Sequence, residues 1–281
     1  MFKKIVAEAL LEDFAFDDIT SDLTIPQNRL VAFEINSREQ IIFCGKSLIE
    51  EVFLQLKKST KFKNSALDFK ILVKDGSLVK SGKSIARGQG DAKLIFAAER
   101  VVLNLIQHSS GVATLTQKFV AELANKKIKI LDTRKTLPGL RDLEKYAVTV
   151  GGGKNHRHNL AEMILIKDNH IAAAGGVSQA ISAVQKSHGK KIEIECDNFE
   201  QVAEAIKSKP DIIMLDNMKP AEIKKCAALI RNHRIKIEIS GGVNLENIKS
   251  FSKLDIDFIS VGALTHSARA VDIGLDVSKI S

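Results

Sequence analysis

The stretch Ile130–Gly176, ILDTRKTLPGLRDLEKYAVTVGGGKNHRHNLAEMILIKDNHIAAAGG, places short apolar runs next to cations and glycines. The same order recurs downstream, where four apolar runs end on a polar residue or a glycine. These are Ile192–Ile194 before Glu195, Ile212–Leu215 before Asp216, Ile235–Ile239 before Ser240, and Phe258–Val261 before Gly262. A helix-like segment usually follows each run. This repetition predicts an α/β barrel whose site lies at the rim where the strands end.

The size and composition are those of a globular protein with one large or two moderate domains. The chain has 281 residues, of which 44% are hydrophobic and 27% charged. No apolar run is long enough for a membrane span, and acids interrupt the apolar N-terminal segment, which therefore predicts an amphipathic helix and not an export signal. Three widely spaced cysteines predict neither a disulfide framework nor a zinc site. We therefore expect a cytoplasmic protein without a membrane partner.

The formal charge of +8 favours an anionic partner. Most of the positive charge is lysine spread over expected helix surfaces, which indicates solvated faces more than a nucleic-acid footprint. Aromatic residues are only 5% of the chain, and among the cationic loops only Tyr146 offers a stacking platform. A net positive charge also suits a small, highly anionic substrate. We expect no nucleic-acid partner.

Two domains are expected from the change in pattern along the chain: residues 1–109, and an α/β barrel over residues 110–267, with 268–281 returning to the first domain. The first domain mixes helix patterns near 2–14 and 46–58 with strand patterns near 30–38, 40–44 and 67–73. Residues 92–105 and 110–124 predict two helices separated by Ser109-Ser110-Gly111. Strands are then expected near 128–132, 163–166, 191–195, 211–215, 235–239 and 257–261. Helices are expected near 142–150, 177–187, 198–207, 219–232 and 244–253. Six strands are fewer than eight, so the barrel is expected to be incomplete.

Cations at the strand ends predict an anion site. Arg134 and Lys135 follow an expected strand and precede a Pro-Gly turn, and together they can grip one anion. Residues 151–157, GGGKNHR, form a second cradle in which glycines allow close backbone approach while His156 and Arg157 supply charge. A metal pair of His156 and His158 is disfavoured because an arginine separates them. Lys167 can clamp an anion or form a Schiff base.

Carboxylates and glycines complete the predicted site. Glu195 and Asp216 end consecutive strands, so both are expected at one rim, where they suit magnesium or a carbocation-like transition state. The segments Ser240-Gly241-Gly242 and Gly262-Ala263 follow the last two expected strands, a common place for phosphate to bind backbone N–H groups. His266 can add a donor there. This inventory predicts substrates that carry several phosphates and carboxylates.

The chain resembles the quinolinate phosphoribosyltransferases over nearly its whole length. The similarity is carried by DTRKTLPGLRDLEKYAVTVGGGKNHR, LIKDNHI, LDN, SGG and SVGALTHS in that order, by residues 99–104 and 110–114, and by the opening LLEDFAFDDITSDLTIP. Asp17, Asn159 and the segment 40–42 depart from the usual pattern, where glycine is common. The resemblance implies an N-terminal α/β sandwich, an incomplete α/β barrel typical of type II phosphoribosyltransferases, and a homodimer as the smallest active unit.

The resemblance also implies the reaction and the roles of individual residues. Quinolinate and phosphoribosyl pyrophosphate would give nicotinate mononucleotide, pyrophosphate and carbon dioxide with Mg²⁺, in NAD synthesis. The pyridine dicarboxylate would be held by Arg134, His156, Arg157 and Lys167, and by Arg100 from the neighbouring subunit. The phosphorylated sugar would contact Lys135, Ser240, Gly241, Gly242, Gly262 and Ala263, and Thr133, Val261 and His266 are further residues expected to bind substrate. Glu195 and Asp216 would bind the metal directly or through substrate phosphates and, with Lys135, act in catalysis.

Three other readings remain open from the sequence. A metal-transport-associated paralogue shares the DTRKT and GGG/HR features, although LIKDNH argues for a complete dicarboxylate grip. A Schiff-base lyase or aldolase would use Lys167. A basic nucleic-acid-binding protein would lack phosphoribosyl transfer altogether.

Overall fold

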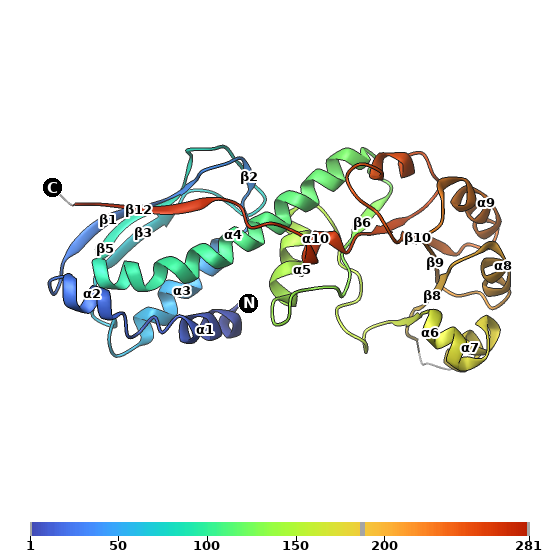
Figure 1. Cartoon of the computed structure of the whole chain (residues 1–281), viewed down its shortest axis with the longest axis horizontal. Coiled ribbons are helices and arrows are strands. Elements are labelled where there is room, and N and C mark those ends of the chain that lie inside the picture. Colours follow the sequence, from blue (N-terminus) through green and yellow to red (C-terminus); the bar gives the residue numbers. More distant parts are fainter. Residues whose placement is uncertain (1, 186–188, 280–281) are drawn as a thin grey trace. The chain divides into compact units, whose positions relative to one another are not determined.

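The computed structural model describes residues 2–185 and 189–279, which divide into two compact units. Unit 1 comprises residues 2–115, 137–152 and 267–279, and unit 2 comprises residues 116–136, 153–185 and 189–266. The segment Leu137–Gly152, within the range expected for the barrel, therefore belongs to unit 1. It contains helix α5 (Arg141–Val150) (Figure 1).

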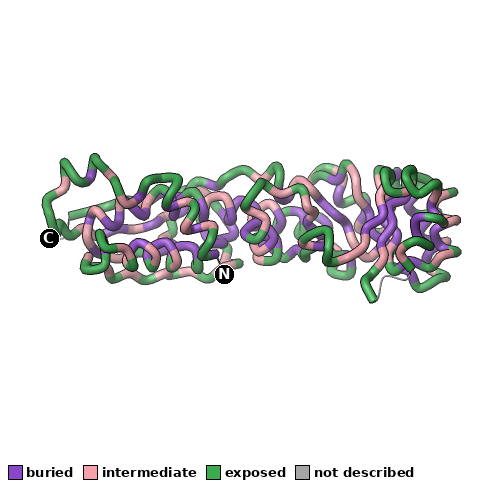
Figure 2. Tube along the Cα trace, turned by 90° about the horizontal axis from the view of Figure 1, so that it is seen from below, coloured by how far each residue is buried: buried purple, intermediate pink, exposed green. Residues whose placement is uncertain are grey.

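Unit 1 is built on a four-stranded antiparallel sheet in the order β12-β1-β5-β3. The strands are β1 (Leu30–Ser37), β3 (Leu67–Ile71), β5 (Ser84–Asp91) and β12 (Ile273–Lys279), and a small pair joins β2 (Ile41–Ile42) to β4 (Leu78–Val79). The other helices are α1 (Lys3–Glu12), α2 (Ile19–Thr24), α3 (Lys46–Lys58) and the first part of α4 (Ala92–Leu123). Phe33 and Ile35, two residues apart on β1, share one buried face and join Phe53 of α3 in the core. Figure 2 shows buried residues in the interior of the chain trace.

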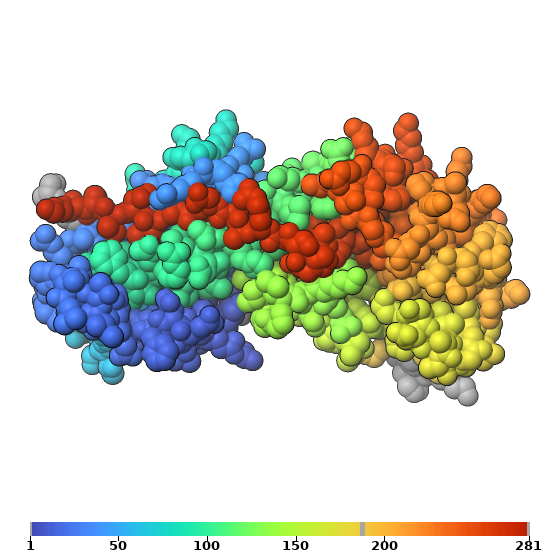
Figure 3. All heavy atoms as spheres, viewed as in Figure 1, coloured from blue at the N-terminus to red at the C-terminus, as the bar shows by residue number. Residues whose placement is uncertain are grey.

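The C-terminal segment is part of unit 1. Strand β12 pairs with β1 in antiparallel register, with Ile35 opposite Leu275. The space-filling view shows this segment at the surface (Figure 3). The last described strand is therefore an edge strand of the sheet to which the first strand of the chain belongs.

Helix α4 corrects one prediction from the sequence. A single helix of 32 residues runs through Ser109-Ser110-Gly111, where two helices were expected. The small residues serve close packing: the Ser109 hydroxyl donates to the carbonyls of Leu105 and Cys44, and a Cβ on Gly111 would lie 2.1 Å from the Arg269 carbonyl oxygen. Serine and glycine are small enough to let other backbone segments pack against the helix at this point. The prediction of a helix break was therefore wrong.

Unit 2 contains the predicted parallel sheet, in the order β6-β11-β10-β9-β8-β7. The strands are β6 (Lys129–Leu131), β7 (Ile164–Ile166), β8 (Ile192–Cys196), β9 (Ile212–Asp216), β10 (Lys236–Ser240) and β11 (Phe258–Ser260). Each is within two residues of its expected bounds. Because all six are parallel, their carboxyl ends meet at one edge. The predicted fold class, an α/β barrel of fewer than eight strands beside an N-terminal sheet domain, is confirmed.

Three helices of unit 2 agree with the sequence pattern: α7 (Val177–Val184), α8 (Phe199–Lys207) and α9 (Pro220–Arg231). Two short helices, α6 (Asp168–Ala174) and α10 (Ala263–His266), were not expected. The helix expected over 244–253 is instead a single 3₁₀ turn, η1 (Ile248–Phe251). Asn244 and Asn247 each accept the other's backbone N–H at 2.9 Å, and such side-chain bonds compete with a regular helix.

Cys44, Cys196 and Cys226 are all buried free thiols. Among the described residues, no helix combines the length and the apolar character that crossing a bilayer requires.

Candidate active site

A cavity of about 500 Å³ lies at the carboxyl ends of the unit 2 strands and gathers most of the predicted site. Its lining includes eleven predicted residues: Thr133, Arg134, Lys135, His156, Arg157, Lys167, Glu195, Asp216, Ser240, Gly241 and Gly242. It also includes Leu165, Met214, Asn217 and Ser260, which sequence reasoning missed. Met214 lies two residues before the end of β9, and Ser260, the last residue of β11, lies one residue before the strand end expected from the sequence, so a search for expected strand ends passed over both.

Five predicted residues do not line this cavity. Val261, Gly262, Ala263 and His266 lie just beyond β11, and Arg100 is exposed on α4 in unit 1. Gly262 nevertheless lies beside the site, because a Cβ there would approach Lys135 Cδ at 3.3 Å and His266 Nε2 at 3.1 Å. The Thr265 hydroxyl donates to the Lys135 carbonyl at 2.7 Å, which fixes this loop against the Arg134–Lys135 turn.

Two arginines place concentrated positive charge in the cavity. Burial, and then the nearby Arg134 guanidinium, lower the pKa of Arg157. Arg157 is only 8% exposed, its Nη1 donates to the Met163 carbonyl at 3.0 Å, and its buried Nε has no hydrogen-bond partner among the described residues. An anion between the two guanidiniums would relieve their repulsion and add charge-assisted hydrogen bonds.

Lys167 and Glu195 form an ion pair at the end of β7 and β8. The Lys167 side chain is 44% exposed, whereas that of Glu195 is 9% exposed. The Lys167 backbone N–H donates to His170 Nδ1 at 3.0 Å, so His170 holds the backbone of this residue in place. The predicted dicarboxylate clamp Lys167 and the predicted sugar or metal ligand Glu195 thus neutralise one another.

A group of carboxylates suits a hard divalent cation. One oxygen each of Glu195, Asp197 and Asp216 lie within 4.8 Å of one another. Magnesium prefers oxygen ligands and binds through one or two carboxylates together with substrate phosphates, so this donor set fits the ion that the sequence resemblance implies. Asp197 was not predicted; it lies two residues after Glu195, just beyond β8.

The glycines of the Ser240–Gly242 loop are required by close contacts. Gly241 has φ +87°, and a Cβ there would lie 2.2 Å from Asn217 Oδ1. Gly242 also has a positive φ of +60°. Asn217 donates its backbone N–H to the Ser240 carbonyl at 3.0 Å and its Nδ2 to the Asp216 carboxylate. The loop therefore brings bare backbone beside Asp216, as a phosphate-binding turn requires.

His156 has both ring nitrogens directed at protein groups. Its Nδ1 accepts the Arg157 backbone N–H at 2.7 Å, while Nε2 lies 3.0 Å from a Glu193 carboxylate oxygen and 3.6 Å from one of Glu238. The His156 backbone N–H donates to Asp132, a buried residue following β6. A direct bond from this ring to a substrate carboxylate stays a prediction.

Glu193 and Glu238 form a buried carboxyl pair that sequence reasoning missed. Both residues are 0% exposed, and one oxygen of each lies within 4.8 Å of the other and of a His156 ring nitrogen. The Ser260 hydroxyl donates to Glu238. Burial raises the pKa of both carboxyls, and for Glu238 the neighbouring Glu193 is the next cause. The protonated forms are therefore favoured in the folded protein.

This pair predicts a pH dependence of stability. Because the pKa of Glu238 is higher in the folded than in the unfolded protein, its contribution to the free energy of unfolding is largest below pH 4.5, the ordinary pKa of glutamate. This contribution is lost as the pH rises through the pKa of the folded protein. Each pKa unit corresponds to about 1.4 kcal/mol. Urea unfolding is expected to show wild-type stability falling from pH 5 to 8, and Glu238→Gln to fall less. An equal decline in both proteins would contradict the assignment.

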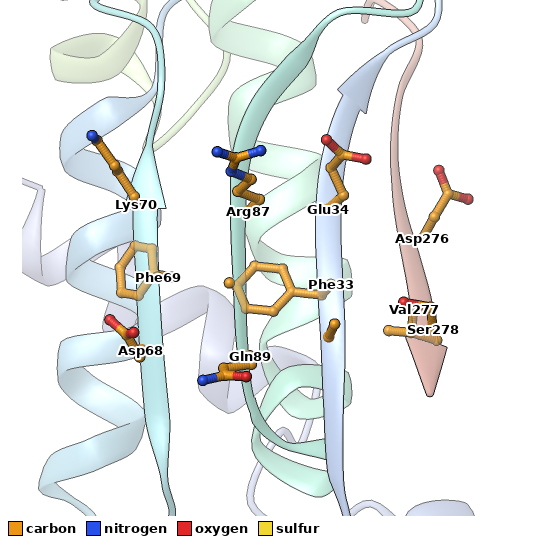
Figure 4. Close-up of a pocket in the computed structure, with 12 residues that line it drawn as sticks. Phe33, Glu34, Asp68, Phe69, Lys70, Arg87, Gln89, Asp276, Val277 and Ser278 are labelled. Atoms are coloured by element: carbon orange, nitrogen blue, oxygen red, sulfur yellow. The ribbon is translucent and has the colours of Figure 1, made fainter. Parts of the chain in front are cut away.

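A second hollow, of about 620 Å³, lies on the sheet of unit 1. Lys70, Arg87, Glu34 and Asp276 lie in register across its four strands (Figure 4). The positive charge of Arg87 lies opposite the negative charge of Glu34 on the neighbouring strand. The residues that line the hollow include neither a histidine nor a cysteine. The balanced charge distinguishes it from the cationic cavity of unit 2.

Comparisons with known proteins agree with the geometry. Residues 18–110 match the family model of the quinolinate phosphoribosyl transferase N-terminal domain, and residues 112–276 match that of the C-terminal domain. The chain is 42% identical over 278 residues to the probable nicotinate-nucleotide pyrophosphorylase (carboxylating) of Bacillus subtilis, covering 98% of this chain and 93% of that protein. The counterpart of Methanocaldococcus jannaschii, also termed probable, is 40% identical, with 98% and 96% covered. The crystal structure of nicotinate-nucleotide pyrophosphorylase from Ehrlichia chaffeensis superposes with a TM-score of 0.92 at 41% identity, covering 99% of both chains.

Proposed function

Because the chain belongs to the quinolinate phosphoribosyltransferase family, we propose that it transfers the phosphoribosyl group of phosphoribosyl pyrophosphate to quinolinate. The products are nicotinate mononucleotide, pyrophosphate and carbon dioxide, in the biosynthesis of NAD. The observation that carries the proposal is the single cavity in which Arg134, Arg157 and Lys167 lie beside Glu195 and Asp216.

The cations act first by bringing two anions together. Quinolinate is a dianion and phosphoribosyl pyrophosphate carries more negative charge, so the two repel in water. Arg134 and Arg157, whose positive charges repel each other, bind the dicarboxylate and hold its ring nitrogen toward the anomeric carbon of the sugar. Such positioning can lower a barrier by about 7–11 kcal/mol.

The carboxylates act as pyrophosphate leaves. Departure of this group builds positive charge on the sugar, which Glu195 and Asp216 stabilise at the rim of the cavity. Their oxygens, with that of Asp197, would hold Mg²⁺. When bound, the ion neutralises negative charge on the pyrophosphate. The backbone of Ser240–Gly242 and the side chain of Lys135 contact the sugar phosphates.

Loss of carbon dioxide follows from the chemistry of the product ring. Once the nitrogen is ribosylated the ring is a pyridinium, and its positive charge stabilises the electron pair left by the departing carboxylate. The protein then has to exclude competing reactions and provide a proton.

A turnover assay on the purified protein tests the proposal. With phosphoribosyl pyrophosphate and Mg²⁺, we expect carbon dioxide release from quinolinate and a strong preference for quinolinate over nicotinate. Preference for nicotinate would overturn the carboxylating assignment, and no release from quinolinate would favour the paralogue. Trapping of Lys167 by borohydride with a carbonyl substrate would instead support a Schiff-base enzyme.

We also propose a homodimer in which Arg100 completes the cavity of the partner subunit, and a cytoplasmic location. Support for the dimer comes from the family resemblance and from the exposure of Arg100 on α4. The buried free thiols support a reducing compartment.

Mixing two inactive variants tests the shared site. Arg100→Ala and Asp216→Asn are each expected to be inactive alone, whereas their mixture, after subunit exchange, should recover about a quarter of wild-type activity. This follows because random pairing leaves one intact site in half of the dimers. Mixing Arg100→Ala with Arg100→Ala/Asp216→Asn supplies the control, which should stay inactive. No recovery on confirmed subunit exchange would contradict a site shared between subunits.

A further inference from the structure

The proposed reaction needs a proton at the ring carbon that loses its carboxylate, and the residues assigned so far leave its source open. The donor must reach the cavity at the carboxyl ends of the strands. It must also regain a proton from solvent on each turnover. Ser260 and Glu238 meet both conditions through one contact.

Ser260 is the member of this pair that faces the substrate. It is the last residue of β11, lines the 500 Å³ cavity and is only 4% exposed. Its hydroxyl is hydrogen-bonded to a carboxyl oxygen of Glu238 on the adjacent strand β10. A hydroxyl can donate and accept at once, so it can pass a proton between a carboxylic acid and a third group.

Glu238 reaches a different hollow. A cavity of about 530 Å³ includes Glu238 in its lining together with Met163, Lys191, Ile212 and Phe258, which precede or begin strands. It therefore lies toward the amino ends of the strands, and it shares His156 and Arg157 with the lining of the substrate cavity. Glu238 lies in the buried wall of this hollow, with 0% of its surface exposed, and its hydrogen bond to Ser260 links it to the substrate cavity.

We propose that Ser260 protonates the ring carbon after decarboxylation and that Glu238 resupplies Ser260 with a proton drawn from the amino-end hollow. This rests on the proposed function, because quinolinate decarboxylation is what creates the need for the proton. Ser260 is the catalytic residue, and Glu238 acts through it.

The transfer balances as follows. The bond between the ring carbon and the carboxylate breaks, carbon dioxide leaves, and the electron pair remains on the carbon. That pair forms a C–H bond as the Ser260 O–H bond breaks, and the Ser260 oxygen takes the proton of the Glu238 carboxyl in the same step. The Glu238 carboxylate then takes a proton from water in the amino-end hollow.

The surroundings of Glu238 favour the protonated state that this step consumes. The groups that face it are Glu193 of β8, His156 of the loop after β6, and Ser260 of β11. Burial, followed by the Glu193 carboxyl, raises the Glu238 pKa, which outweighs the opposing effects of His156 and Ser260. A carboxyl held neutral by burial can serve as a proton donor near neutral pH.

Single-turnover rapid quench, following pyrophosphate and nicotinate mononucleotide separately, tests the relay. In Ser260→Ala and Glu238→Gln, pyrophosphate release is expected at close to the wild-type rate. Nicotinate mononucleotide formation is expected to slow by roughly 100-fold or more, the contribution typical of a general acid. Ser37→Ala, which removes a buried hydroxyl of unit 1 bonded to the Glu39 carbonyl, is the control and should leave both rates unchanged.

The outcomes separate the relay from the reaction itself. If wild-type protein forms no nicotinate mononucleotide, the proposed function fails. If wild type turns over but both variants form product at its rate, or if both steps slow together as in general damage, the relay is overturned. Should Ser260→Ala fail to fold, the same comparison is made with Glu238→Gln, which preserves the shape of the side chain.

Discussion

Replacing Arg157 by alanine is expected to weaken quinolinate binding by about 2–5 kcal/mol, a loss of roughly 30-fold to several thousand-fold. The guanidinium is 8% exposed in the cavity, beside Arg134 and with a buried Nε that has no partner among the described residues. Its removal takes away charge-assisted bonds that water cannot replace in that position. Isothermal titration with quinolinate, together with thermal unfolding, measures the effect on binding apart from the effect on folding.

Two further variants sharpen this result. Arg157→Lys keeps the charge but loses the planar pair of donors, so affinity should fall between those of wild type and alanine. Arg231→Ala is the matched control: Arg231 is a partly buried arginine of unit 2 that pairs with Asp255 and Asp257 outside the cavity. Unchanged quinolinate affinity in Arg157→Ala would indicate that this residue is purely structural.

The strand ends could be predicted because the relevant pattern is local. Five of the six apolar runs in unit 2 are followed within one or two residues by a group that lines the cavity, as Ile212–Leu215 is followed by Asp216. Parallel pairing then brings these ends together without any further information. The position of Lys167, Glu195 and Asp216 in one cavity follows from this rule.

Site residues that lie before the strand ends were not predicted, although the alternation of side chains along a strand could have indicated them. Side chains two apart on a strand share a face, so Glu193 must lie on the same side as Glu195, and Glu238 on the same side as Ser240. An isolated IEIE pattern indicates a sheet with one solvated face, whereas here the polar face is buried in unit 2. Only the three-dimensional arrangement shows that the two carboxyls meet at His156.

Contacts across long stretches of sequence account for the other differences. The Ser109–Gly111 segment was interpreted as a helix break because its packing partners, Cys44 and Arg269, lie far away in the chain. Asp197, on the exposed side of the strand end, joins Glu195 and Asp216 only through the fold of the loop after β8. Neither set of contacts produces a periodic pattern of residues in the sequence.

The Lys167–Glu195 ion pair links the two halves of the cavity. A dicarboxylate that binds Lys167 competes with Glu195 for the ammonium group, and thereby releases that carboxylate toward the sugar and its cation. Binding of one substrate would in this way prepare the site of the other. Asp216 has no such cationic partner among the contacts of the described residues, and its contribution can therefore be tested more directly.

Asp216→Asn is expected to reduce kcat by about 10²–10³-fold, the usual effect of removing one electrostatic stabiliser of a transition state. The amide preserves the size of the side chain but lacks the charge that stabilises the sugar as pyrophosphate leaves. It also removes one of three clustered carboxylates, so Mn²⁺ binding in the presence of phosphoribosyl pyrophosphate, followed by electron paramagnetic resonance, should weaken.

Asp211→Asn provides the control at the opposite end of the same strand. Asp211 precedes β9, and its carboxylate accepts the Ile192 backbone N–H at 2.7 Å, so its role is confined to holding β8 against β9. Asp211→Asn should reduce stability modestly while leaving kcat and Mn²⁺ binding close to wild type. If Asp216→Asn retained wild-type turnover and Mn²⁺ affinity, the carboxylates at the strand ends would have no part in stabilising the departing pyrophosphate, because only their charge separates this variant from the native protein.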